Sequence, residues 1–306
     1  VCVDARLKAG MSLLALVQRK TSRFKNANRP ATLVLAMNAP PKVDLYNSAY
    51  GNVATETYRQ IRLETYGDDL GQTSWISSEE CREIPKLLAI ARDSNVLEIG
   101  CGSGGYALQL AVTTGARILG LDINESGIDK ANQLAQAKGL AAQARFELRD
   151  VTQDLASPAH TFDAAFANDV LCHIPARPAL LAEIFRVLKP GCRLVFSDAL
   201  VIGGMVSHEE IATRSSVGFY VYSPPGENER LLAQAGFVQI HAKDTTAQAA
   251  QIAKRWHDAR EKRKPALVAA ETEAKFAGVQ KFLLCVHTLT NERRLVRYLY
   301  SATKPL

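Results

Sequence analysis

The chain lacks any long apolar run. No window of its 306 residues approaches the roughly 18 consecutive apolar residues that a membrane-spanning helix needs, so we expect no membrane span. Paired cysteines are also missing, because the six cysteines are scattered, with no C-x-x-C pair and no histidine at zinc-finger spacing. These absences argue against a structural metal and predict a reduced, cytoplasmic protein.

Acidic residues are scarce only at the start of the chain. Residues 1–43 carry eight basic side chains and one acidic side chain, a net charge of +7, whereas the remaining 263 residues carry a net charge of −1. A groove that follows nucleic-acid phosphates needs lysine and arginine concentrated on a folded surface. The neutral body of the chain therefore predicts no nucleic-acid partner.

Residues 1–43 are interpreted as a separate basic extension. Their composition is similar to that of organelle transit peptides, although the apolar run at 13–17 is too short for a secretory signal. Terminal segments with a high net charge are often disordered. We expect this extension to be disordered, with organelle targeting as the alternative to a cytoplasmic location.

Organised patterning begins near residue 44. Apolar residues recur every three to five positions between 45 and 64, which favours one or two helices. A turn-rich loop follows and ends on Trp75, an aromatic of the kind expected on a surface, and Ser77 with Glu80 then opens a further helix. Residues 44–92 are therefore predicted to form a helical lid before the main domain.

The main domain, residues 93–245, opens with a strand, a glycine-rich turn and a helix. The strand at 96–99 runs directly into G-C-G-S-G-G at 100–105, and residues 106–113 favour a helix. Glycines allow positive φ and close approach of a ligand, and a helix N-terminus offers free N–H groups. The same glycines satisfy G-x-G-x-x-G, so a dinucleotide-binding domain remains open beside any other nucleotide cradle.

Polar residues follow the next strands. The strand at 118–121 ends in Asp122, whose carboxylate can accept hydrogen bonds from both hydroxyls of a ribose. Asp150 follows a strand at 144–148 and can accept from an adenine amine, and Asn168 follows a fourth strand. Helices at 127–138 and 180–188, a turn at 189–191 and a strand at 193–197 continue the alternation. This order predicts an α/β fold with a doubly wound, mostly parallel sheet.

Taken together, V-L-E-I-G-C-G-S-G-G at 96–105, the two strand-end acids and R-V-L-K-P-G at 186–191 resemble class I S-adenosylmethionine-dependent methyltransferases over about residues 75–245. The resemblance implies a Rossmann-like, seven-stranded sheet, S-adenosyl-L-methionine as cofactor and S-adenosyl-L-homocysteine as product. It also implies the cofactor-binding residues. These are Glu98 and Gly100 near the methionine portion, Gly102 and Gly104 along the approach of the cofactor, Asp122 at the ribose, Asp150 and Val151 at adenine, Asn168 beside the sulfonium and the substrate, and Ile123.

A closer resemblance is to the phosphoethanolamine and sarcosine/dimethylglycine N-methyltransferases. The segments that carry it are Y-G-D-D-L at 66–70 with W-I-S-S at 75–78, D-V-L-C-H-I at 169–174 and L-Y-S-A-T-K at 299–304. The resemblance implies that His173 lies at the active site and that a tyrosine of the N-terminal helices, Tyr58 or Tyr50, pairs with it.

The chemistry of methyl transfer makes these residues plausible. The reaction demands mainly that a lone pair be held in line with the methyl carbon. An ammonium acceptor must first lose its proton, which His173 can accept or relay. Trp75, Tyr220 and Tyr222 are candidate substrate contacts, the last two as an aromatic wall for a cationic acceptor.

The sequence therefore predicts methylation of a small molecule, at an amine nitrogen. The alternatives left open are O- or C-methylation of a natural product or quinone, a cofactor-binding partner protein without catalysis, and a nicotinamide-binding module. The Asn/Asp-Pro-Pro-aromatic motif of nucleic-acid amino-methyltransferases is absent after Asn168. Residues 246–306 are predicted to form a helical insertion and a closing strand, in which the basic run at 254–264 is a solvated helix face.

Overall fold

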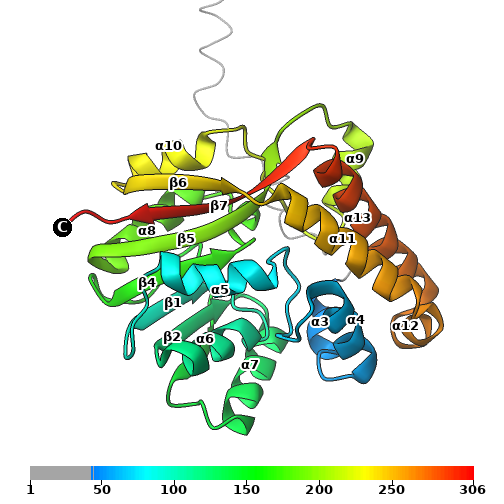
Figure 1. Cartoon of the computed structure of the whole chain (residues 1–306), viewed down its shortest axis with the longest axis horizontal. Helices are drawn as coiled ribbons and strands as arrows, with labels where there is room; N and C mark the ends of the chain where they lie inside the picture. The colour runs from blue at the N-terminus through cyan, green and yellow to red at the C-terminus, as the bar shows by residue number, and fades with distance from the viewer. Residues whose placement is uncertain (1–42, 44) are drawn as a thin grey trace, which may run out of the picture. The chain divides into compact units, whose positions relative to one another are not determined.

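A seven-stranded sheet with the order β3-β2-β1-β4-β5-β7-β6 runs through the computed structural model, which describes residue 43 and residues 45–306 (Figure 1). The predicted basic extension, except for Val43, lies outside the described residues. The strands are β1 (Asn95–Ile99), β2 (Arg117–Asp122), β3 (Ala144–Leu148), β4 (Phe162–Asn168), β5 (Leu188–Ile202), β6 (Val238–Asp244) and β7 (Leu295–Thr303). Strands β1 to β5 pair in parallel, and β7 runs antiparallel between β5 and β6. The predicted doubly wound, mostly parallel fold is confirmed.

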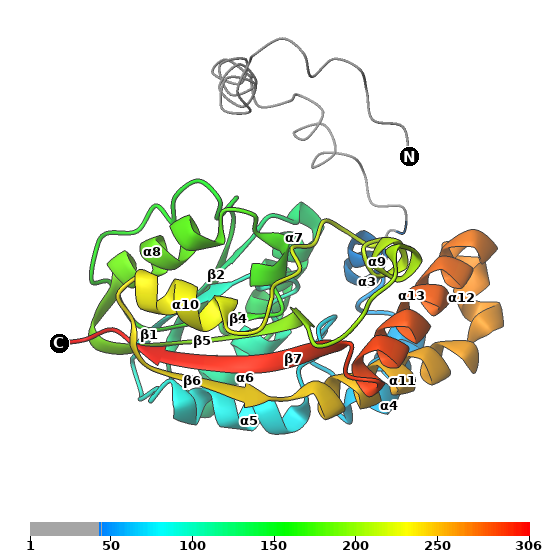
Figure 2. The ribbon, with the colours of Figure 1, turned by 90° about the horizontal axis from the view of Figure 1, so that it is seen from above.

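Helices cover both faces of the sheet. They are α3 (Tyr46–Gly51), α4 (Glu56–Tyr66), α5 (Ser78–Leu87), α6 (Gly105–Thr114), α7 (Glu125–Ala137), the 3-10 helix η2 (Leu171–His173), α8 (Arg177–Val187), α9 (His208–Arg214), α10 (Glu227–Gln234), α11 (Thr246–Glu261), α12 (Lys264–Glu271) and α13 (Glu273–Asn291). Figure 2 shows α5 and α6 on one face and α8 and α10 on the other. None of the helices described here is long and apolar enough to cross a membrane.

Each face buries its own apolar layer. On one face Ile84 of α5 and Leu108 of α6 pack with residues of α7, and on the other Ile184 of α8 and Leu232 of α10 pack against the sheet. Fully burying an aliphatic side chain contributes roughly 1.5–3 kcal/mol. These layers hold the parallel strands in register, so that their carboxyl ends meet at one edge of the sheet.

A third apolar cluster joins α4 to the helices α11, α12 and α13, which lie to one side of the sheet in Figure 1. Trp75 belongs to it, with its ring centroid 5.8 Å from that of Trp256 and 6.1 Å from that of Phe282. Only 5% of Trp75 is exposed. The expectation of a surface aromatic was wrong, because helices distant in sequence supply the aromatic partners that bury it.

One predicted turn also differs. Residues 189–191 were expected to separate a helix from a strand, but β5 starts at Leu188, directly after α8. The pairing of β4 with β5 shifts register between Phe162 and Ala164, and Gly191 has a φ of 76°. The change of direction that was expected in a turn between helix and strand therefore occurs within the pairing of β4 with β5.

Candidate active site

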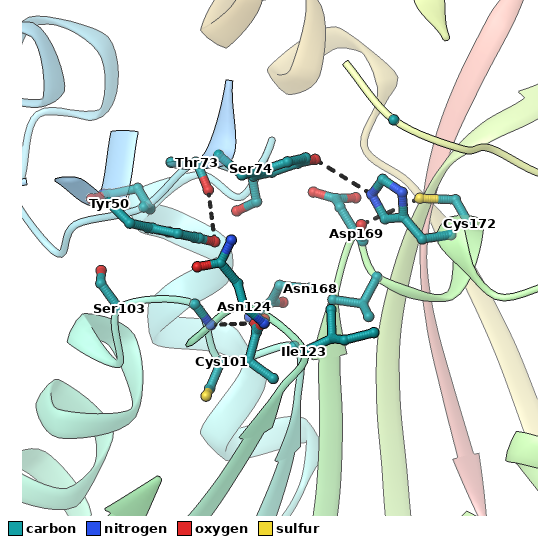
Figure 3. A pocket seen from close by; sticks show the side chains of 18 of the residues that line it. Tyr50, Thr73, Ser74, Cys101, Ser103, Ile123, Asn124, Asn168, Asp169 and Cys172 are labelled. Carbon is teal, nitrogen blue, oxygen red and sulfur yellow. Dashed lines mark hydrogen bonds between the residues drawn. The ribbon is translucent and has the colours of Figure 1, made fainter. Parts of the chain in front are cut away.

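A cavity of about 420 Å³ lies at the carboxyl ends of β1, β2 and β4. In open α/β sheets, ligands bind at this edge, where the strand order reverses. The α4–α5 loop, residues 67–77, contributes Leu70 to Ile76 to its lining, and α3 contributes Tyr46 and Tyr50. Figure 3 shows Tyr50 and Thr73 on the side of the cavity opposite Ile123. Helix α3 and the α4–α5 loop thus cover the edge of the sheet at which the glycine-rich turn lies.

The glycine-rich turn is tied to the acid at the end of β2. The amide of Gly102 donates to Oδ2 of Asp122 at 2.8 Å, and the amide of Asn124 donates to Oδ1 at 2.8 Å. Gly102 has a φ of 52°, and a Cβ there would lie 2.6 Å from the phenol oxygen of Tyr50. Gly100, at a φ of 72°, also lines the cavity. Only glycine leaves room at Gly102 for the close approach of Tyr50.

Gly104 differs from these two glycines. It is absent from the cavity lining, and a Cβ at this position would meet Phe146 at 2.7 Å and Ala131 at 2.8 Å. The tight packing of Phe146 and Ala131 explains the glycine at this position, while its contact with a cofactor stays a prediction.

Glu98 presents a buried carboxyl to the cavity. It is 4% exposed, and its Oε2 has no hydrogen-bond partner. Burial, followed by the nearby charge of Asp122, raises the pKa of Glu98 to about 8. Burial also raises the pKa of Asp122, although backbone amide donors oppose the shift. Because buried polar atoms are nearly always paired, this oxygen is available to accept from a water or from a donor group of a ligand.

The remaining predicted cofactor residues line the same cavity. Ile123 is 72% exposed at the rim, and Asn168 follows the buried part of β4 (Figure 3). Asp150 and Val151 also contribute to the lining, and Oδ1 of Asp150 accepts from the amide of Thr152 at 2.9 Å. The structure therefore brings eight of the nine predicted cofactor residues to one cavity, with Gly104 as the exception.

His173 stands at the other end of the cavity, on the 3-10 helix η2. Its Nδ1 donates to the backbone carbonyl of Phe219 at 2.9 Å, which leaves Nε2 as an acceptor 3.4 Å from the phenol oxygen of Tyr46. Burial lowers the pKa of His173 to about 4, and the hydrogen bond to Phe219 opposes that shift. Burial, with a smaller effect of Tyr220, raises the pKa of Tyr46 well above its usual value. A neutral imidazole therefore faces a protonated phenol.

The predicted partner of His173 was wrong. The phenol of Tyr58 donates to Glu271 and lies 3.3 Å from Oγ of Ser48, away from the cavity lining. Tyr50 does line the cavity, but its phenol lies 3.5 Å from Oγ1 of Thr73 rather than beside His173. Tyr46 was missed, although the four-residue spacing from Tyr50 places both on one face of a helix.

Arg214, the last residue of α9, is a second residue that sequence reasoning missed. It lines the cavity, is 1% exposed and has no hydrogen-bond partner at Nη1. Its guanidinium carbon lies 4.5 Å from the ring centroid of Tyr220, 5.2 Å from Phe282 and 5.8 Å from Trp75. No sequence motif signals it, because these three aromatics come from separate elements.

This arginine corrects the predicted aromatic wall. Tyr220 lines the cavity, but its ring already contacts the guanidinium of Arg214 and the imidazole of His173, whose ring centroid lies 4.4 Å away, so less of it is left to face a cationic acceptor. Tyr222 lies outside the cavity lining, with its phenol 2.9 Å from Oγ of Ser215. Across residues 45–306, no group of three or more His, Cys, Asp or Glu side chains is placed to hold a metal ion.

Comparison with known proteins agrees with this fold. Residues 90–259, more than half of the chain, match the profile of the methyltransferase domain, and the chain belongs to that family. It is 34% identical over 163 residues to sterol 24-C-methyltransferase erg-4 of Neurospora crassa, covering 51% of this chain and 43% of the relative. It is 30% identical over 230 residues to phosphoethanolamine N-methyltransferase 1 of Triticum aestivum, covering 74% of this chain and 45% of the relative.

A solved structure shares the fold. Phosphoethanolamine N-methyltransferase 2 of Haemonchus contortus, in complex with phosphomonomethylethanolamine and S-adenosylhomocysteine, superposes with a TM-score of 0.72 at 19% identity, covering 85% of this chain and 60% of that one. The chain spans less than half the length of the two curated relatives. The resemblance predicted from the sequence, to class I methyltransferases including the phosphoethanolamine branch, is confirmed.

Proposed function

We propose that this protein transfers a methyl group from S-adenosylmethionine to a nitrogen of a small molecule that also carries an acidic group. The observation that carries the proposal is that one cavity has an end suited to an adenosyl cofactor and another end suited to a methyl acceptor. The glycine-rich turn, Asp122 and Glu98 lie at one end, and Tyr46, His173 and Arg214 lie at the other.

The first end fits an adenosyl cofactor. Asp122 would accept from the ribose hydroxyls, since it stands at the end of β2 beside the turn. The unpaired Oε2 of Glu98 would accept from an ammonium group, and Asp150, Val151 and Ile123 would border the adenine. S-adenosylmethionine supplies a methyl group on a sulfonium, and when the lone pair of the acceptor bonds to that carbon the carbon–sulfur pair returns to sulfur.

The second end favours an acidic acceptor. A buried cation without a counter-charge costs several kcal/mol, and Arg214 has no carboxylate partner within residues 45–306. A carboxylate or phosphate on the acceptor would supply that partner, because the guanidinium binds both groups through parallel N–H donors. That the Haemonchus neighbour holds phosphomonomethylethanolamine supports this class of acceptor.

The pair of Tyr46 and His173 would prepare the nitrogen. The phenol donates to Nε2, so its oxygen lone pair can take a proton from an ammonium as its own proton moves to His173. Because the pKa of His173 is about 4, the imidazole does not keep this proton at neutral pH and passes it on to solvent. The nitrogen is then left with the lone pair that the methyl transfer requires.

The test is the formation of S-adenosylhomocysteine with a panel of acceptors, in which each amine is supplied with and without a carboxylate or phosphate, beside phenols and a sterol. We expect turnover of an acidic amine that Asp122→Ala and His173→Ala abolish and that the matched variant Tyr58→Phe retains. Turnover of the sterol or a phenol alone would replace N-methylation by C- or O-methylation. Tight binding of S-adenosylhomocysteine without any turnover would contradict a catalytic role.

A further inference from the structure

Arg297, the third residue of β7, is a fully buried cation held by two acidic side chains. Its Nε donates to Oδ1 of Asp169 at 2.9 Å, and its Nη1 donates to Oε1 of Glu80 at 2.5 Å and to Oγ1 of Thr245 at 2.8 Å. Arg297 is 0% exposed, and Glu80 is 2% exposed. Such a cluster requires a reason, because burying charges costs more than an apolar replacement of the same shape.

The first carboxylate reaches the wall of the cavity. Asp169 lines the cavity directly after β4, and its Oδ2 accepts from the backbone amide of Trp75 at 2.9 Å (Figure 3). Ser197 of β5 donates to Oδ1 of Asp169 at 3.0 Å and accepts from its amide at 2.9 Å. Asp169 has a φ of 56°, which a residue other than glycine adopts at a free-energy cost of about 1–3 kcal/mol. The surrounding hydrogen bonds therefore hold the turn that leads to His173.

The second carboxylate reaches the same loop two residues later. Oε2 of Glu80 accepts from the amide of Ser77 at 2.9 Å, as part of the capping box at the start of α5. One guanidinium is thus linked through two carboxylates to two backbone amides, those of Trp75 and Ser77. Both amides belong to the α4–α5 loop, whose residues 70–76 line the cavity.

This arrangement acts on both ends of the proposed site. The loop lies over the start of α6, where a Cβ on Gly105 would meet the carbonyl oxygen of Leu70 at 1.8 Å. The ring of Trp75 lies 5.8 Å from the guanidinium carbon of Arg214. A movement of the loop would therefore displace two parts of the cavity together. These are the wall beside the glycine-rich turn and the ring of Trp75 that packs against Arg214.

We infer that Arg297 is a positioning residue, which fixes the α4–α5 loop over the cavity through Asp169 and Glu80. The inference rests on the proposed function for its catalytic consequence, although the effect on the loop can be measured without turnover. Because a misplacement of about 1 Å can reduce a rate by about a hundredfold, loosening this loop is expected to impair catalysis well beyond its effect on folding.

The loop carries its own probe. The chain has two tryptophans, Trp75 and Trp256, so Trp256→Phe leaves Trp75 as the single emitter. In that background Arg297→Lys keeps the positive charge but removes the planar guanidinium, whose separate N–H groups reach both carboxylates. We expect acrylamide quenching of Trp75 to rise at least twofold, and both the affinity for S-adenosylhomocysteine and kcat to fall at least tenfold.

Arg177 offers a matched control. It is 3% exposed and donates to the buried Asp198 at 2.8 Å, but it does not line the cavity. Arg177→Lys should lower Tm as much as Arg297→Lys does while leaving Trp75 quenching and S-adenosylhomocysteine affinity unchanged. If both variants change these two quantities equally, or if Arg297→Lys lowers Tm alone, Arg297 is merely structural and the inference fails.

A second variant covers the case in which Arg297→Lys does not fold. Asp169→Asn keeps the shape of the side chain but leaves a single oxygen as acceptor. In the unaltered protein one carboxylate oxygen accepts from Arg297 and the other accepts from the amide of Trp75. It should raise Trp75 quenching in the same way, and unchanged quenching would overturn the inference. If the unaltered protein did not bind S-adenosylhomocysteine, the proposed function would fall, while the quenching would still decide the role of Arg297.

Discussion

The phenol oxygen of Tyr46 lies 3.4 Å from Nε2 of His173, although 127 residues separate the two in the chain. The first residue of α3 is thereby placed against the turn that follows β4. We predict that Tyr46→Phe reduces kcat by about a hundredfold, in the range that a positioned proton-transfer group contributes. The affinity for S-adenosylhomocysteine should stay within twofold, because the cofactor end of the cavity is untouched.

Tyr58→Phe is the matched control for this change. Its hydroxyl donates to Glu271 outside the cavity lining, so its removal should lower the free energy of unfolding by about 1 kcal/mol and leave kcat within twofold. Steady-state kinetics and thermal unfolding of both variants test the prediction. Equal losses of kcat in the two would show that Tyr46 has no special place in the reaction.

The buried imidazole of His173 makes stability depend on pH. Its pKa is about 4 in the folded chain and near 6.5 when exposed, so the unfolded chain binds the proton more readily. The stability contributed by the neutral ring is complete above about pH 6.5 and is lost as the pH falls toward 4. Between pH 8 and pH 5 we predict a loss of roughly 2 kcal/mol from this group. Urea unfolding of the unaltered protein and of His173→Asn checks it, since the asparagine variant should lack that part of the pH dependence.

Glu98 should make cofactor binding release a proton. With a pKa of about 8 it is mostly protonated at pH 7, and an ammonium group at its free oxygen would favour the charged form. The affinity for S-adenosylhomocysteine should therefore rise between pH 7 and pH 8. Calorimetry in buffers of different ionisation enthalpy measures the released proton, which Glu98→Gln should abolish. Release of the same amount of proton from the variant would contradict this assignment.

Arg214 should stabilise the complex with an acidic acceptor and lower the stability of the protein without ligand. Replacing it by methionine removes a buried, unpaired charge, so Arg214→Met should raise Tm without ligand and raise the KM of an acidic acceptor at least tenfold. Arg177→Met is the opposite case, because it leaves the carboxylate of Asp198 buried without its cationic partner and should lower Tm. If Arg214→Met lowered Tm and left KM unchanged, the arginine would serve packing alone.

The cofactor end of the site could be predicted from the sequence because its parts are local. The glycine-rich turn follows β1 directly, and Asp122 is the last residue of β2, so the order of strands is enough to place Asp122 beside Gly102. Each signal lies within a few residues of the element that positions it. The same holds for Asn168 at the end of β4.

The acceptor end depends on contacts between distant elements. The sequence does not distinguish the tyrosines at 46, 50 and 58, since each recurs at helical spacing among apolar residues. Only the packing of α4 against α11 to α13 shows that Tyr58 faces Glu271. Arg214 has no motif, since its environment is made by aromatics from three elements. Sequence periodicity gives the side of a helix that is buried, but not the element that it meets.

The insertion of β7 between β5 and β6 also has a consequence for synthesis. Asp169 precedes Arg297 by 128 residues, so at roughly 5–20 residues per second the ribosome makes the carboxylate about 6–25 s before its counter-ion. Throughout that interval the nascent polypeptide holds two acids, Asp169 and Glu80, that have not yet met the guanidinium with which they are buried. The ion pairs that link Arg297 to Asp169 and Glu80 can therefore form only after the strand that carries Arg297 has left the ribosome, which delays completion of this wall of the cavity until β7 is available.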